Sequence, residues 1–112
     1  MAQAGDKLSE AKAMIGRLRS QHPAEAGALF DFMGEARGSA LDERDKELIN
    51  VALSVAARCE WATAFHAMQA ARAGAGRAEI IEAGFMAVLM HGGPALAYLT
   101  PLIRAVDELF DD

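Results

Sequence analysis

The chain is rich in residues that favour helices over strands. Alanine occupies 25 of its 112 positions, whereas the β-branched residues Val, Ile and Thr together occupy 11. Alanine has the highest intrinsic helix propensity, and β-branched residues are enriched in strands. Apolar residues also recur at helical spacing between Gly and Pro breaks, so the sequence predicts an all-α fold of about six helices. Its length is that of a single domain, expected to span residues 1–112.

Particular residues mark where these helices begin and end. Pro23 suits the first position of a helix, and Asp42 suits the cap before one. The expected helices run from about 6 to 20, from 23 to between 34 and 38, from 43 to about 57, from about 60 to 73, from about 79 to 91, and from 94 to about 109. We expect the last to be a single helix with a kink at Pro101.

Composition and charge restrict the partners of the chain. Hydrophobic residues make up 53% and charged residues 24%, which is typical of a globular protein. The net charge of −5 argues against nucleic acid or an anionic membrane as the main partner. A domain this small and this apolar is expected to bury surface against other subunits, which predicts a homo-oligomer.

The sequence also bears on localisation. Residues 1–13 mix charged residues with alanine and lack the apolar core of a secretion signal, so a cytoplasmic protein is expected. Residues 84–103 contain no Asp, Glu, Lys or Arg, which is close to the length of a membrane span. The segment from His91 to Pro94 interrupts this stretch, and lipid offers no hydrogen bonds to a broken helix. We therefore expect two buried helices and a turn rather than a membrane span.

Cys59 is the first candidate for chemistry. It is the only cysteine, which excludes an intrachain disulfide and a multi-cysteine metal site. It falls at or just before the amino end of a predicted helix, where the helix dipole favours a thiolate, and Arg58 would act in the same direction. The alternative is that a lone cysteine is simply a small buried apolar residue.

His66 and Glu47 are the other candidates. On one helix, positions 59, 62 and 66 share a face, and the rise from Cys59 to His66 is roughly 10 Å, too far for a direct hydrogen bond. Position 62, where a middle group would touch both, holds Ala62. Taken alone, His66 is expected to be a core or interface histidine and Glu47 a surface charge. No cofactor, nucleotide or metal motif accompanies them.

Together these residues resemble a family pattern. The alkylhydroperoxidase D-like branch of the carboxymuconolactone decarboxylase family has Glu-x11-Cys-x2-Cys-x3-His, and this chain has Glu47, Cys59, Ala62 and His66 at those spacings. The motif region spans 42–91, and its flanks resemble the family in Asp45–Ile49, in Ala73–Ile81 and in Gly92–Ala95. The resemblance extends over residues 22–110.

The resemblance implies an all-helical domain that assembles as trimers or hexamers. In thiol-active members a cysteine pair reduces a hydroperoxide while cycling between dithiol and disulfide, and the Glu and His form a proton relay. Carried over, Glu47 and His66 would be the relay and Cys59 the first thiol, with Ala62 at the position of the second. Such a cycle needs no cofactor, but it needs a dithiol reductant such as a small dithiol protein or a lipoyl carrier.

Ala62 leaves three interpretations open. The chain is either an impaired or one-thiol peroxidase, in which an external thiol resolves a sulfenic acid on Cys59, or a non-redox relative. The decarboxylase branch acts on a small lactone acid without the thiol pair, and Arg58 is the only basic residue expected near the site. A non-redox relative could also be a small-molecule-binding oligomeric protein. The third interpretation is a structural homo-oligomer that carries out no chemistry. The sequence does not distinguish a natural Ala62 from an engineered one.

Overall fold

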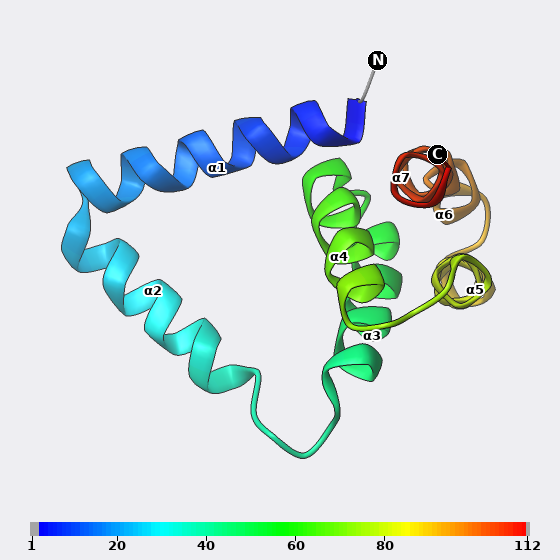
Figure 1. Cartoon of the computed structure of the whole chain (residues 1–112), viewed down its shortest axis with the longest axis horizontal. Coiled ribbons are helices and arrows are strands. Elements are labelled where there is room, and N and C mark those ends of the chain that lie inside the picture. Colours follow the sequence, from blue (N-terminus) through cyan, green and yellow to red (C-terminus); the bar gives the residue numbers. More distant parts are fainter. Residues whose placement is uncertain (1–2, 112) are drawn as a thin grey trace.

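Residues 3–111 are described by this computed structural model, and they form seven helices (Figure 1). In chain order these are α1 (Gln3–Gln21), α2 (Pro23–Ala36), α3 (Glu43–Ala56), α4 (Glu60–Arg72), α5 (Arg77–His91), α6 (Gly93–Ala97) and α7 (Leu99–Phe110). The prediction of an all-α fold is confirmed. None of the helices in the described range is long and apolar enough to cross a membrane.

The two helix starts marked by Pro23 and Asp42 are confirmed, whereas α1 begins at Gln3 and α5 at Arg77, a few residues earlier than expected. Asp42 caps α3, and its side-chain Oδ1 accepts a hydrogen bond from the backbone N–H of Asp45 at 2.8 Å. Pro23 occupies the first turn of α2. Between α3 and α4 the chain turns through Arg58, the one non-glycine residue of the described chain with a positive φ, at 57°. This tight link sets α4 directly against α3.

The carboxyl-terminal helix differs from the prediction. Instead of one helix with a kink at Pro101, the chain forms the short α6 and then α7, and the break falls at Tyr98. Pro101 has no N–H to donate to the carbonyl of Ala97, and its ring would clash with that carbonyl in a continuous helix. A new helix that begins at Leu99 places Pro101 in its first turn, where no such bond is required.

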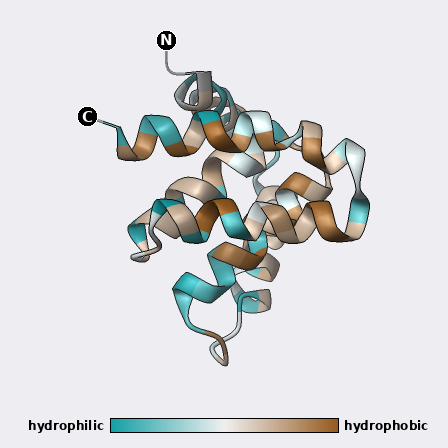
Figure 2. Cartoon of the chain, turned by 90° about the vertical axis from the view of Figure 1, so that its right-hand side faces the viewer, coloured by the Kyte–Doolittle hydropathy of each residue, from teal (hydrophilic) through white to brown (hydrophobic). Residues whose placement is uncertain are grey.

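The core lies between α3, α4, α5 and α7, which pack against one another. Its fully buried side chains include Val51 and Val55 of α3, Ile80 of α5, and Leu102 and Val106 of α7. Figure 2 shows hydrophilic and hydrophobic segments alternating along α7, as expected for a helix with one buried face.

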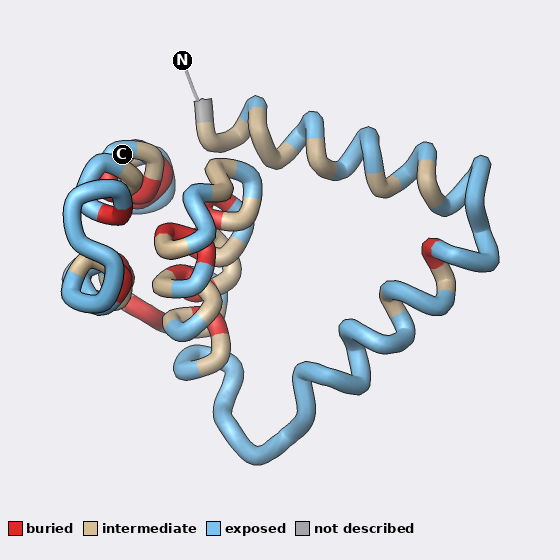
Figure 3. The backbone as a smooth tube through the Cα atoms, turned by 180° about the vertical axis from the view of Figure 1, so that it is seen from behind, coloured by how far each residue is buried: buried red, intermediate tan, exposed pale blue. Residues whose placement is uncertain are grey.

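α1 and α2 form an arm that leaves this core. The amino end of α1 is held against α7 by the backbone N–H of Ala4, which donates to Glu108 at 3.1 Å. α2 packs mainly on α1, and Ala26 is its one buried residue. Figures 1 and 3 show α1, α2 and the α3–α4 pair as three sides of an open triangle, and Figure 3 shows α2 exposed along nearly its whole length. We refer to α1 and α2 together as the arm.

Candidate functional site

Glu47 and His66 are in direct contact. Glu47 lies in the second turn of α3 and His66 in the second turn of α4, and the packing of these two helices brings their side chains together. His66 Nδ1 is 2.7 Å from Glu47 Oε1. The Glu47 side chain is only 2% exposed, so the expectation of a surface charge is wrong. It was based on residue type alone, whereas helix packing buries this position.

A third residue, Arg37, completes the surroundings of the carboxylate. Arg37 follows the end of α2, and its Nη2 lies 2.9 Å from Glu47 Oε2. The same nitrogen donates a hydrogen bond to Glu43, and the contact with Glu47 is an ion pair without hydrogen-bond alignment. The hydrogen bond to Glu43 and the neighbouring Glu47 carboxylate raise the pKa of Arg37 above its ordinary value. Arg37 in turn holds the pKa of Glu43 below its usual range.

Sequence reasoning missed Arg37 and named Arg58 as the only nearby basic residue, which is wrong. Arg37 and Glu47 are separated by the loop between α2 and α3, and only the fold brings them together. The one sequence signal for Arg37 was its place as a basic residue at the end of a helix, followed by acidic residues. This pattern is too common to identify a site residue. Arg58 is exposed in the turn before α4.

Cys59 is the residue that caps α4, as the sequence predicts. Its Sγ accepts a hydrogen bond from the backbone N–H of Ala62 at 3.5 Å, and the side chain is partly buried. Along α4, Cys59 is about 10 Å from His66. The structure therefore places Glu47 in contact with His66 but leaves the Cys59 thiol two helical turns away from the imidazole. Ala62 lies on the same face of α4, between Cys59 and His66.

Thr63 adds a polar group to this face of α4. It is three residues before His66 and four after Cys59, so helical spacing places it between them. Thr63 is fully buried, and its Oγ1 has no hydrogen-bond partner in the described part of the chain. An unpaired buried hydroxyl is unfavourable, and sequence reasoning gave it no role.

His66 lines an open pocket of about 480 Å³ formed by α2, the following loop, α3 and α4. Its apolar walls come from Met33, Leu41, Ile49 and Phe65. Phe65 stands edge-on to the imidazole, with ring centroids 5.0 Å apart.

The pocket's positive charges are paired within the chain. Arg37 contacts Glu43 and Glu47. Lys46 Nζ lies 3.5 Å from Glu43 and donates to the Gly38 carbonyl at 2.8 Å. Paired charges beside apolar walls favour a small neutral ligand over a strongly charged one.

Comparisons with known proteins agree with this architecture. Residues 23–105 match the carboxymuconolactone decarboxylase family. An uncharacterized protein of Cupriavidus necator is 33% identical over 104 residues, which is 92% of each chain. Uncharacterized protein 4 in the cox locus of Paracoccus denitrificans is 37% identical over 70 residues, and the match spans 62% of this chain and 63% of that protein.

A solved structure gives the same result for the fold. The crystal structure of an apo carboxymuconolactone decarboxylase family protein from Legionella pneumophila superposes with a TM-score of 0.86 at 31% identity, covering 96% of this chain and 97% of that one. With the sequence match over most of its length, this chain belongs to the carboxymuconolactone decarboxylase family.

Proposed function

We propose that Glu47 and His66 are the proton relay of a thiol-dependent peroxidase-type site in which Ala62 stands where the reacting thiol would be. The observation that carries the proposal is the 2.7 Å contact between His66 Nδ1 and the buried Glu47 carboxylate. An ionised carboxylate can only accept a hydrogen bond, so this contact favours a proton on Nδ1. The other ring nitrogen, Nε2, is then available to take a proton from a neighbouring acid.

Position 62 is the place for that acid. It precedes His66 by four residues on the same face of α4, so a cysteine there would lie one turn from the imidazole. Its backbone N–H already contacts the sulfur of Cys59. A thiol at 62 would therefore lie between a proton acceptor and a second thiol, and it could attack a peroxide and then form a disulfide with Cys59.

With Ala62 in place, we expect only slow, one-thiol peroxide reduction. The Cys59 thiol would take the terminal peroxide oxygen and release an alcohol, leaving a sulfenic acid. An external dithiol would then reduce the sulfenic acid, giving water, a disulfide of the reductant and the regenerated thiol. Cys59 lies too far from His66 for direct proton transfer, which is why this route should be slow.

The decisive experiment is to introduce the missing thiol. We expect Ala62→Cys to raise hydroperoxide consumption with a dithiol donor by at least about 100-fold, because loss of a nucleophile costs many orders of magnitude in rate. Ala62→Ser is the matched control, with similar size and no thiol, and it should stay at the starting rate. Adding His66→Asn to Ala62→Cys should remove most of the gain. The proposal is wrong if Ala62→Cys forms the disulfide with Cys59 but does not consume peroxide faster.

A non-redox function is the second candidate, and the pocket favours it. The relay opens on a pocket with apolar walls and paired charges, which suits acid–base chemistry on a small neutral molecule and requires no thiol. A neutral lactone is one such molecule, whereas the lactone acid expected for the decarboxylase branch would need a basic partner for its carboxylate, and both Arg37 and Lys46 are already paired with acidic side chains. Under this function Cys59→Ser leaves turnover unchanged and His66→Asn abolishes it, whereas one-thiol peroxide reduction is lost in Cys59→Ser.

A further inference from the structure

Arg37 and His66 contact different oxygens of one buried carboxylate. Nη2 of Arg37 lies 2.9 Å from Glu47 Oε2, and Nδ1 of His66 lies 2.7 Å from Glu47 Oε1. The Glu47 side chain is 2% exposed, so water does little to balance its charge. The balance of charge around the carboxylate therefore depends on Arg37 and on whether the His66 ring carries one proton or two.

The other charged groups near Glu47 face elsewhere. Lys46, the preceding residue of α3, directs its Nζ to Glu43 and to a backbone carbonyl. Glu43, one turn earlier on α3, is 65% exposed and shares the Arg37 guanidinium with Glu47. Among the residues that line the His66 pocket, Arg37 and Lys46 are the other ionisable side chains. Arg37 is therefore the cation that balances the buried carboxylate.

The total charge of this group decides how readily His66 takes up a second proton. With Arg37 present, the charges of the guanidinium and the carboxylate cancel, so a protonated imidazole would leave a net positive charge in a partly buried site. Without Arg37, the carboxylate would leave a net negative charge, and a second proton on His66 would neutralise it. An imidazole with two protons is a donor at both nitrogens and cannot accept another proton.

We propose that Arg37 is a positioning residue of the proton relay: its guanidinium cancels the charge of the Glu47 carboxylate, so that His66 keeps one proton on Nδ1 and leaves Nε2 free to accept one. Arg37 acts through Glu47 and not on the reacting atoms. The inference rests on the proposed function in so far as His66 serves as a base. The charge balance itself exists whichever reaction the site carries out.

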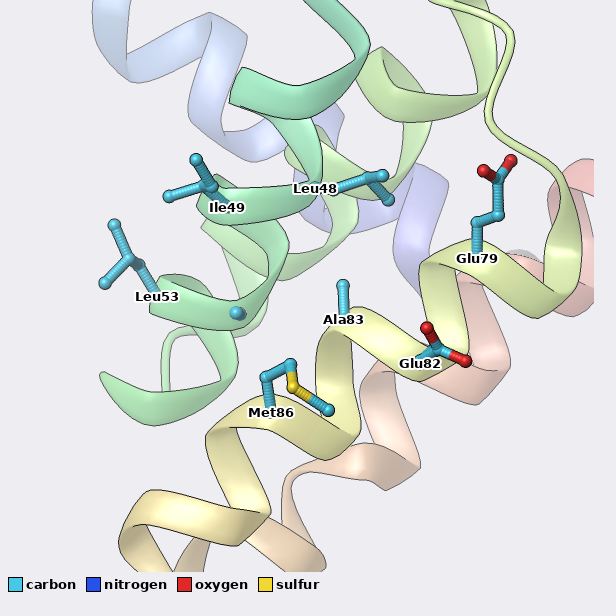
Figure 4. A pocket seen from close by; sticks show the side chains of 8 residues that line it. Leu48, Ile49, Leu53, Glu79, Glu82, Ala83 and Met86 are labelled. Carbon is cyan, nitrogen blue, oxygen red and sulfur yellow. The ribbon is translucent and has the colours of Figure 1, made fainter. Parts of the chain in front are cut away.

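Another arginine ion pair provides the matched control. Arg44 Nη1 of α3 lies 2.7 Å from Glu79 Oε2 of α5, and the Arg44 side chain is 44% exposed, close to the 37% of Arg37. Glu79 lines a groove of about 360 Å³ between α3 and α5 (Figure 4). Glu47 and His66 do not line this groove. Replacing Arg44 therefore removes an arginine charge from the same region without removing a contact of Glu47.

The first test is an NMR titration of the His66 imidazole in the full chain, with its signal assigned by its loss in His66→Asn. We expect Arg37→Gln to raise the midpoint of this titration by about 1 pH unit, because removing a nearby like charge favours the protonated ring and the partial exposure of Arg37 limits the effect. Arg37→Lys keeps the charge and should restore most of the difference. Arg44→Gln should move the midpoint clearly less, since solvent and salt screen a charge that is not in contact.

The possible outcomes separate this role from a structural one. If Arg37 only holds the loop before α3 in place, Arg37→Gln lowers stability and leaves the titration unchanged, which overturns the proposal. A midpoint that moves to lower pH overturns it too, as does an equal rise in Arg44→Gln. Circular dichroism verifies that each variant stays helical.

A second test connects Arg37 to the proposed function. In an Ala62→Cys background, the acid limb of kcat/KM for a hydroperoxide should move up by about 1 pH unit when Arg37 is replaced by Gln, because a coupled thiol and imidazole hold their protons to higher pH once a nearby cation is lost. An unmoved limb in an active background overturns the proposal. If Ala62→Cys consumes no peroxide faster, the proposed function is wrong, and the NMR titration still decides the role of Arg37.

Discussion

Replacing Glu47 with Gln tests whether the contact between α3 and α4 contributes to stability as the structure implies. The change preserves size and removes the charge of a side chain that is 2% exposed and held between His66 and Arg37. A hydrogen bond that involves a charged group contributes about 1.5–3 kcal/mol. The side chains of His66 and Arg37 are 23% and 37% exposed, so water can replace part of the interaction that each loses with the Glu47 carboxylate. We therefore expect Glu47→Gln to lower the free energy of unfolding by about 1–3 kcal/mol.

Urea unfolding followed by circular dichroism at one fixed protein concentration measures this change. His66→Asn and the double variant complete a cycle, and the two residues should couple by about 1–2 kcal/mol because they share one contact. Glu43→Gln is the matched control, since Glu43 also contacts Arg37 but is 65% exposed, and its effect should be clearly smaller. If Glu47→Gln unfolds like the natural chain, or the cycle shows no coupling, the buried pair does not exist in solution.

Three further predictions follow from particular positions. Gly84→Ala should lower the melting temperature although Ala favours helices, because its Cβ would lie 2.5 Å from Leu102 Cδ2 and overpacking costs about 1–3 kcal/mol. Thr63→Val should raise the free energy of unfolding by about 1 kcal/mol, since it removes an unpaired buried hydroxyl; a decrease in urea unfolding would mean that the hydroxyl has a partner. The lowered pKa of Glu43 means that its ion pair with Arg37 stabilises the fold above the ordinary pKa of 4.5 and is lost as pH falls below it. Glu43→Gln should therefore flatten the acid side of a plot of stability against pH, and an unchanged slope would contradict this.

The features that were predicted from the sequence depend on short-range interactions. The cap at Asp42 needs only its own side chain and an N–H three residues later. Cys59 at the start of α4 likewise follows from a local change of pattern. The break at Tyr98 was not predicted, because the effect of Pro101 extends one turn back, and a kink and a clean break look the same in sequence.

The arm could not be predicted, because its position depends on packing rather than propensity. The spacing of Leu29, Phe30 and Met33 indicates a helix with an apolar face, and α2 is such a helix. The same pattern describes a helix packed in its own core and one that packs on another chain. In this chain most of that face is exposed, and sequence periodicity does not show whether an apolar helix face is buried within its own chain.

For the candidate site, the spacing of Glu47, Cys59 and His66 identified the candidate residues from the sequence. The burial of Glu47 could not be predicted in this way. Taking a carboxylate out of water costs several kcal/mol, and an apolar residue of similar volume is often as stable or more so. The carboxylate is therefore not what the fold requires there. The His66 contact at 2.7 Å and the Arg37 ion pair offset its cost, and both partners also line the 480 Å³ pocket. A charge that is expensive to bury and whose partners face a pocket is better explained by chemistry at that pocket than by stability.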